Sequence, residues 1–185
     1  MAEASKAADR LQSLAGRRAA GPHIEIAPAE PAFRLSLRAP EKSLAALSRA
    51  LGVSLPRKPK CAAASGTRAA LWLGPDEWLI IDTGKNNPAD ALASSRVSHS
   101  AVDVSHRNTA VIVSGPGAET ALSAGCPQDL DRRKFPVGAC SRTIFGKAEV
   151  VLWRTGEDAF RVECWRSLSP YVFDFLEEAA RDTAH

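Results

Sequence analysis

The stretch 69–81 constrains this chain most, because two apolar runs flank a strong turn signal at its centre. Pro75 follows Gly74 there, and a proline, whose φ is fixed near −65°, suits the second position of a type I turn. The same restriction rules out the positive φ of the tightest hairpin turns. We therefore expect an antiparallel β-hairpin with an even loop, most simply the four residues 74–77.

An even loop also determines which residues of the hairpin lie opposite each other. Leu73 is predicted to face Trp78, and Trp72 is predicted to face Leu79. Because side chains alternate along a strand, the two tryptophans should point to opposite sides of the sheet. Both sides then carry large apolar residues, so the hairpin needs cover on both faces.

The composition is that of a globular chain. Its 185 residues are 45% hydrophobic, which is enough for a substantial core. Lys and Arg total 24 against 21 Asp and Glu, so the net charge of +3 does not indicate nucleic-acid binding. No apolar run approaches the ~20 residues of a membrane-spanning helix, and the start lacks a secretory signal. We expect a cytoplasmic protein.

No catalytic, cofactor-binding or metal-binding residue is predicted. The run 103–106 contains Ser105 and His106 but no elbow glycine, and neighbours in a strand point to opposite faces. The glycine turn at 115–117 lacks the third glycine of a dinucleotide fingerprint, and Glu119 suits the helix start but would repel a phosphate. The cysteines form no CxxC pair, so free buried thiols are expected. They are Cys61, Cys126, Cys140 and Cys164.

Residues 1–31 differ from the rest of the chain. They are rich in alanine, with a weak helical stripe at 5–18 and several glycines and prolines after it. We interpret them as an N-terminal arm that is partly disordered or bound to a partner. Residues 32–182 are predicted to form one α+β domain, with possible lobes at 32–98 and 99–182.

Within that domain, alternating and helical patterns predict antiparallel strands and packed helices. The strand at 32–38 alternates apolar residues with a basic face expected to meet solvent. Gly52 should end a core helix that begins at 41. The remaining predicted elements are a short helix ending near 95, strands at 99–104 and 109–114, a helix opening at 115–119, a meander of 139–145, 148–154 and 159–165, and a helix at 169–181.

Several basic and aromatic residues are candidates for contact with a partner protein. Arginine and tryptophan are enriched where interfaces concentrate their binding energy. The most basic cluster is 132–134, and a second basic loop spans 57–60. The interface candidates are Arg17, Arg18, Arg132, Arg133, Lys134, Trp153 and Trp165.

Three stretches together resemble a known family. Residues 71–81, 103–120 and 138–176 look like the gamma subunit of heterotetrameric sarcosine oxidase. More distantly, the Val113-Ser114-Gly115-Pro116 run, the 142–153 hairpin and the 159–167 strand are similar to the folate-binding domain of glycine-cleavage aminomethyltransferases. The resemblance implies an α+β fold of two small lobes with antiparallel sheets.

The same resemblance implies a non-catalytic structural subunit. The family's complex oxidises sarcosine to glycine with formation of hydrogen peroxide and passes the one-carbon unit to tetrahydrofolate. FAD, FMN, NAD, tetrahydrofolate and zinc are implied in partner subunits, and none in this chain. The implied partners are the alpha, beta and delta subunits, with alpha in direct contact.

The chain departs from the aminomethyltransferase pattern where that family carries paired aspartates, because Glu149 is the one acidic residue at 146–151. Two other functions stay open. One is a free-standing folate-dependent transferase, in which the isolated chain would bind tetrahydrofolate. The other is a nucleic-acid-binding protein that uses the 57–60 loop and the 132–134 cluster, with steeply salt-dependent affinity.

Overall fold

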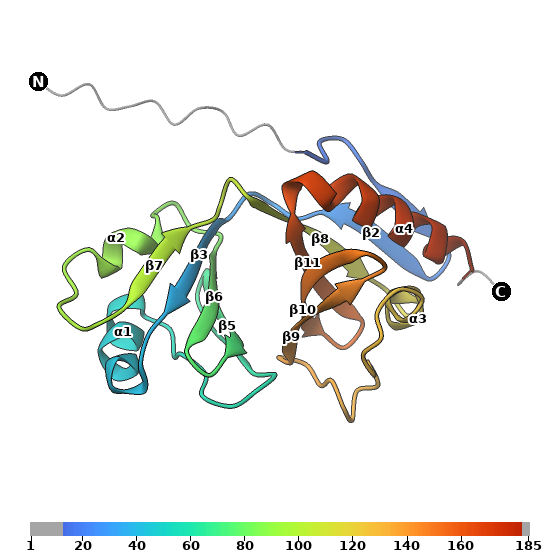
Figure 1. Cartoon of the computed structure of the whole chain (residues 1–185). Coiled ribbons are helices and arrows are strands. Elements are labelled where there is room, and N and C mark those ends of the chain that lie inside the picture. Colours follow the sequence, from blue (N-terminus) through green and yellow to red (C-terminus); the bar gives the residue numbers. More distant parts are fainter. Residues whose placement is uncertain (1–12, 183–185) are drawn as a thin grey trace, which may run out of the picture.

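Two antiparallel sheets lie next to each other, and each carries helices on its outer face (Figure 1). The computed structural model describes residues 13–182. The sheets have five and six strands, with all neighbouring strands antiparallel. This architecture confirms the predicted α+β class with two antiparallel sheets and packed helices.

The five-stranded sheet has the spatial order β4-β5-β6-β3-β7. Helices α1 (Leu44–Leu51) and α2 (Pro88–Leu92) pack on its outer face through a core that includes Leu47 and Trp78. A 3₁₀ turn, η1 (Glu41–Ser43), precedes α1, and Gly52 ends the helix at φ 66°, as predicted from its freedom to adopt positive φ. The strands are β3 (Phe33–Arg38), β4 (Ala62–Ser65), β5 (Arg68–Gly74), β6 (Glu77–Asp82) and β7 (Ser100–Asp103).

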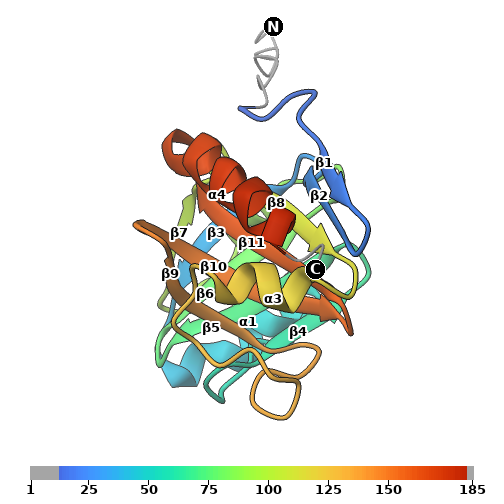
Figure 2. The same cartoon turned by 90° about the vertical axis from the view of Figure 1, so that its right-hand side faces the viewer.

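The six-stranded sheet has the order β1-β2-β8-β11-β10-β9. Helices α3 (Ala118–Ser123) and α4 (Ser169–Asp182) cover its outer face, as the rotated view in Figure 2 shows. A 3₁₀ turn, η2 (Arg166–Leu168), leads into α4. The strands are β1 (Ala19–Gly21), β2 (Ile24–Pro28), β8 (Asn108–Ser114), β9 (Cys140–Phe145), β10 (Ala148–Gly156) and β11 (Ala159–Trp165).

The layers therefore run helix, sheet, sheet, helix, with a separate apolar core between each pair of layers. The inner core, between the sheets, includes Leu71, Leu79 and Ile81 from one sheet and Cys140 and Trp153 from the other. A single backbone bridge, Cys61 to Ala139, also joins the two halves. The inner core has fewer buried apolar residues than either outer core. Ion pairs between the two sheets add to the contact that this small core makes.

The central hairpin is antiparallel as predicted, but its predicted register is wrong. Gly74 pairs with Glu77 across a two-residue connection, and a bulge between Trp72 and Gly74 then shifts the ladder. Trp72 consequently lies opposite Trp78, and both contribute to the core beneath α1 and α2. The extra residue in β5 is Leu73, which a count of loop residues could not reveal.

The N-terminal residues that the structure describes are folded against the second sheet. β1 and β2 form an antiparallel pair, and β2 pairs with β8. Leu14 is buried in the outer core with Ile24 and Ile26. Residues 13–28 therefore contribute to the domain, in contrast to the expected arm, whereas the first part of the predicted helix at 5–18 lies outside the described residues.

The glycine turn before α3 packs against backbone. Gly115 has φ 107°, and an added Cβ would lie 2.5 Å from the carbonyl oxygen of His23. The N–H of Gly117 donates to that oxygen at 2.8 Å. Glu119 lies in the first turn of α3, where its carboxylate pairs with the fully buried Arg154 at 2.7 Å. This turn therefore attaches the β1-β2 hairpin.

Candidate functional site

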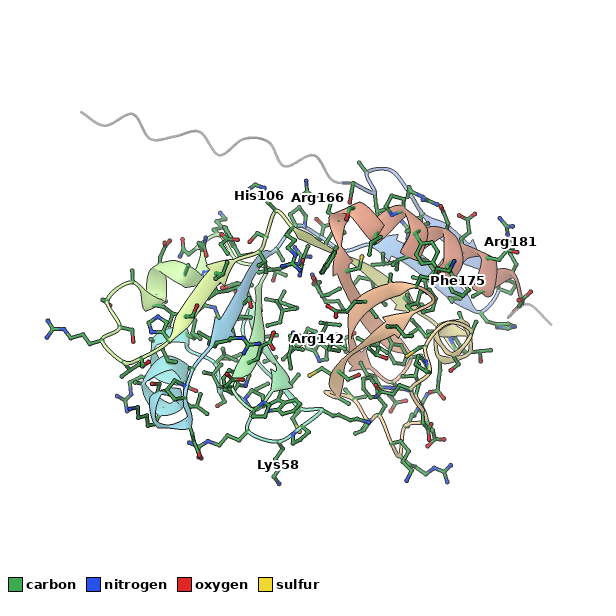
Figure 3. The ribbon with its side chains drawn as sticks, in the orientation of Figure 1. Lys58, His106, Arg142, Arg166, Phe175 and Arg181 are labelled. Carbon is green, nitrogen blue, oxygen red and sulfur yellow. The ribbon has the colours of Figure 1, made fainter. Side chains whose placement is uncertain are left out.

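A cavity of about 140 Å³ lies between the inner faces of the two sheets. Ser36 and Glu77 line it from the five-stranded sheet, and Glu149, Glu163 and Trp165 line it from the six-stranded sheet. Arg142, near the centre of Figure 3, lies at the same interface. Charged side chains of both signs surround the cavity, so its chemistry depends on which charges already have partners.

Glu163 is held by two buried arginines. Arg34 Nε donates to Glu163 Oε2 at 2.5 Å, and Arg161 Nε donates to Oε1 at 2.7 Å. The three residues are 4%, 1% and 7% exposed in the order Arg34, Glu163, Arg161. Charge-assisted hydrogen bonds of this kind are strong and offset the cost of removing the charges from water. Because Arg34 on β3 and Arg161 on β11 each engage one of its carboxylate oxygens, Glu163 joins β3 to β11.

The predicted solvent-facing basic side of the 32–38 strand is therefore wrong at Arg34. The six-stranded sheet covers this position, and Arg34 also donates from Nη1 to the carbonyl oxygen of Ala32 at 3.0 Å. Ser105 supports the same strand: its Oγ accepts the Arg34 N–H at 2.8 Å. The Ser105 hydroxyl thus has a backbone partner, and the adjacent His106 is exposed.

A second ionic bridge crosses between the sheets nearer to solvent. Arg142 on β9 pairs with Glu77 on β6, and Glu77 also accepts from Arg38 at 3.0 Å. The side chains of Arg142 and Glu77 are 38% and 13% exposed. Water can therefore screen this bridge more than it screens the Glu163 cluster.

Trp165 forms an exposed aromatic surface at the mouth of the cavity. It is 40% exposed, and the Arg107 guanidinium lies 4.5 Å from its ring centroid. Strand pairing places Cys164 opposite Val150, so Trp165 is next to Glu149 on the inner face. Glu149, the one acidic residue of the 146–151 stretch, is thus an exposed side chain that lines the cavity.

A family model described as the sarcosine oxidase gamma subunit family matches residues 38–182 of this chain. The chain belongs to the sarcosine oxidase gamma subunit family. The predicted family resemblance is confirmed, and the match includes strands β4 to β11 and every cavity-lining residue except Ser36.

Relatives in this family share more than a third of their residues with the chain over the aligned region. A sarcosine oxidase subunit gamma from Corynebacterium sp. strain U-96 is 37% identical over 154 residues, which is 79% of this chain and 74% of that protein. One from Arthrobacter sp. is 38% identical over 122 residues, covering 64% of this chain. That alignment spans 60% of the Arthrobacter subunit, so the chain matches less than two thirds of that relative's length.

Solved structures show the same fold. A chain of the heterotetrameric sarcosine oxidase from Corynebacterium sp. U-96, in complex with pyrrole 2-carboxylate, superposes with a TM-score of 0.83. It is 30% identical, and the match covers 91% of this chain and 89% of that chain. The glycine cleavage system aminomethyltransferase T from Bartonella henselae has a TM-score of 0.64 at 13% identity, over 86% of this chain and 49% of that chain. The second likeness confirms the predicted fold relationship to aminomethyltransferases.

The N-terminal interface candidates of the gamma-family chain have intramolecular partners. Arg17 pairs with Asp174 at 2.6 Å and lies 4.1 Å over the ring of Phe173, so it attaches residues 13–18 to α4. Arg18 pairs with Glu25 and keeps 70% of its side chain exposed. Arg18 is therefore the more accessible of the two.

The two basic segments of the sequence meet in space. Lys60 and Lys134 line one shallow cavity of about 370 Å³, together with the exposed Val137. Arg132, in contrast, pairs with Glu157 at 3.2 Å and Asp158 at 2.6 Å. Arg133 pairs with Asp131 at 2.8 Å. Lysines thus supply the accessible positive charge, whereas the arginines of the cluster face carboxylates.

The two tryptophan candidates differ in their surroundings. Trp153 packs with the inner core between the sheets, where its indole N–H has no hydrogen-bond acceptor among the described residues. Trp165 is exposed and stacks with Arg107. Trp165 is consequently the one of the pair that an external molecule can reach.

The described cysteines are free, and Cys140 and Cys164 are poor nucleophiles. Burial raises the pKa of the Cys140 thiol to about 12. Burial, with the neighbouring Glu163 carboxylate, also raises the pKa of Cys164 to about 12. Both thiols are protonated at neutral pH, and thiolates are the nucleophiles and metal ligands. Residues 13–182 contain no group of three His, Cys, Asp or Glu placed to hold a metal ion.

The helices described between residues 13 and 182 include none that is long and apolar enough to cross a membrane.

Sequence reasoning did not select Arg34, Arg107, Arg142, Arg161 or Glu163. The sequence contained a signal for Arg161 and Glu163, which lie on β11. Phe160, Val162 and Cys164 alternate toward the outer core, which leaves Arg161, Glu163 and Trp165 on the opposite face. A large aromatic residue on that face was a signal that the face needs cover, and the two charged residues beside Trp165 are indeed buried.

Proposed function

We propose that this chain is a non-catalytic structural subunit of a heterotetrameric sarcosine oxidase, a complex that demethylates sarcosine oxidatively to glycine. The observation that carries the proposal is the superposition with a chain of the Corynebacterium complex, at a TM-score of 0.83 over 91% of this chain. Near-complete coverage of both chains supports an equivalent place in an equivalent assembly.

The partners in this proposal are the alpha, beta and delta subunits, with alpha in direct contact. FAD, FMN, NAD, tetrahydrofolate and zinc are assigned to those partners. The chemistry of the described residues supports that assignment, because the buried carboxylate of Glu163 is fully engaged and the thiols of Cys140 and Cys164 are protonated. The cytoplasmic location stays a prediction.

A free-standing folate-dependent transferase fits the cavity poorly. Sites for drug-sized ligands measure roughly 300–1,000 Å³. The inter-sheet cavity measures about 140 Å³, and Glu149 stands where aminomethyltransferases carry paired aspartates. A nucleic-acid interface is also disfavoured, because Arg132 and Arg133 both have carboxylate partners.

The shallow cavity lined by Lys60 and Lys134 is our candidate contact for an acidic face of a partner subunit. Both lysines are exposed, and Val137, which lines the same cavity, is 54% exposed. Charged rims guide association, and an exposed apolar residue at their centre adds buried area.

Copurification tests the proposal. The chain is co-expressed, untagged, with tagged large subunits, and the purified complex is assayed for sarcosine-dependent hydrogen peroxide. We expect the chain in the complex in equal proportion to the tagged subunits, and no flavin absorbance or turnover from the chain alone. Failure to copurify, or turnover by the isolated chain that a mutation of its own residues abolishes, contradicts the proposal.

A double variant tests the candidate contact. Lys60→Glu with Lys134→Glu should weaken copurification by about tenfold or more, because each change replaces attraction by repulsion. Lys85→Glu, an exposed lysine on another loop, is the matched control and should assemble normally. Equal assembly of the wild type, the double variant and Lys85→Glu would show that the shallow cavity is not part of the interface. The subunit assignment would be unaffected.

A further inference from the structure

The charges around the inter-sheet cavity leave one cation and one anion without partners. Glu163 is engaged by Arg34 and Arg161, and Glu77 by Arg38 and Arg142. What remains of the lining charges is Arg107 and Glu149. Across residues 13–182, neither side chain forms an ion pair or a hydrogen bond, although Arg107 stacks on Trp165. The uncompensated charge of the cavity is therefore a separated pair of opposite signs.

The two groups flank one aromatic side chain. Arg107 lies 4.5 Å from the centroid of Trp165, and the Val150–Cys164 pair at the end of the β10-β11 ladder makes Glu149 and Trp165 the next residues in the same register. Directly opposed residues in antiparallel strands have Cβ atoms roughly 4.5–5.5 Å apart. A molecule placed over the exposed part of the indole can thus reach a guanidinium with one end and a carboxylate with the other.

A neighbouring polar atom also requires a donor. Asn108 lines the cavity, and its buried Oδ1 accepts no hydrogen bond from any described residue. A buried acceptor without a donor costs roughly 1–3 kcal/mol, so this end of the cavity is incompletely satisfied by the described residues. Asn108 follows Arg107 in the chain and is opposite Trp165 in the β8-β11 ladder.

The cavity size limits the ligand. Its volume of about 140 Å³ is close to the ~150 Å³ cavity that binds benzene in an engineered protein, which indicates about six non-hydrogen atoms. A simple anion would meet Glu149, and a simple cation would meet Arg107. A molecule that carries both charges a few bonds apart satisfies both groups.

We propose that this cavity binds a small zwitterionic amino acid, with its carboxylate toward Arg107 and its ammonium toward Glu149. The carbon atoms then contact Trp165. The inference rests on the cavity alone, and it holds whether or not the chain assembles with sarcosine oxidase subunits. It describes binding and involves no reaction.

Titration of the purified full chain tests the proposal without interference from another subunit's active site. The probes are alanine and N-methylglycine, which have about six non-hydrogen atoms, followed by calorimetry and tryptophan fluorescence. Acetate and methylammonium, each with one of the two charges, are the matched probes. We expect saturable binding of both amino acids, and affinity for the single-charge probes lower by about tenfold or more.

Two variants locate the site. Glu149→Gln and Arg107→Gln should each weaken amino-acid binding by about tenfold or more, because each removes one charge-assisted contact. Glu178→Gln and Arg181→Gln, on the exposed side of α4, are the controls and should bind as the wild type does. Circular dichroism establishes that each variant is folded.

Three results would overturn the proposal. The first is the absence of saturable binding by either amino acid, and the second is equal affinity for acetate or methylammonium. The third is binding that neither Glu149→Gln nor Arg107→Gln weakens. If the amino acids do not bind but both variants lose copurification with a partner subunit, the two groups recognise protein and the ligand proposal fails.

Discussion

Two ionic bridges join the same pair of sheets in different surroundings. The Glu163 bridge connects β3 to β11 and is nearly free of solvent, whereas the Arg142–Glu77 bridge connects β9 to β6 with an arginine that is 38% exposed. Both use guanidinium and carboxylate groups. The comparison shows that burial, more than the type of pair, decides how strongly such a bridge constrains the fold.

The largest expected effect is from Glu163→Gln. This change keeps the shape of the side chain and leaves Arg34 and Arg161 as buried charges without a counter-ion. Loss of one partner of a buried ionic cluster costs about 3–5 kcal/mol of unfolding free energy. Urea denaturation followed by tryptophan fluorescence measures this loss, and a loss below about 1 kcal/mol would show that the cluster is as well screened as a surface pair.

Thiol labelling shows where the same variant opens. At pH 8 the buried thiols of Cys140 and Cys164, with pKa values of about 12, should react with iodoacetamide only when the structure opens. Cys140 lies between the sheets and Cys164 lies in the outer core. In Glu163→Gln we expect labelling of Cys140 to accelerate about a hundredfold, since every 1.4 kcal/mol is tenfold, and to exceed that of Cys164.

A change in the pKa of Cys164 works against the expected faster labelling of Cys140. Burial is the main cause of the raised pKa of Cys164, and loss of the Glu163 carboxylate removes the smaller cause, which by itself favours labelling there. Cys126, which is buried in the outer core with Cys164, is the internal reference and should accelerate no more than Cys164 does. Equal acceleration at Cys140 and Cys164 would mean that the bridge supports the whole fold and not the contact between the sheets.

Replacement of the whole cluster separates charge from packing. In the triple variant Arg34→Met, Glu163→Leu, Arg161→Met, no buried charge is left without a partner. Apolar replacement of a buried ionic cluster is often neutral or stabilising by about 1–4 kcal/mol. We expect a midpoint in urea at or above that of the wild type, and a triple variant as unstable as Glu163→Gln would assign the loss to shape.

The elements of this fold were largely predictable, and their registers were less so. Local signals such as Gly52 after α1 and the apolar alternation of β10 and β11 predicted where helices end and strands run. The bulge at Leu73 left no such signal, because a strand with one extra residue has the same apolar composition as a regular strand. One bulged residue was sufficient to bring Trp72 and Trp78 to the same face.

The candidate site was harder to predict, because its residues come from separate parts of the chain. Arg34 has the pattern of a solvent-facing residue in its own strand, and only the packing of β11 onto that face makes it buried. Arg107 and Glu149 lie 42 positions apart by their numbers, and the pairing of strands in the second sheet brings both to the lining of one cavity with Trp165. Pairing across strands is a property of the assembled sheet, so no local spacing announces it.

The smallest expected effect is from the exposed bridge. Arg142→Gln removes its ion pair with Glu77, which keeps the contact with Arg38 at 3.0 Å. Exposed pairs contribute about 0–1 kcal/mol and are screened by salt, so we expect a loss of unfolding free energy below about 1 kcal/mol that shrinks further in 1 M salt. Urea denaturation at low and high salt, with Arg181→Gln on α4 as a control for loss of one exposed arginine, measures it. A loss as large as that of Glu163→Gln, unaffected by salt, would mean that the cavity region shields Arg142 from solvent and that the two bridges do not differ.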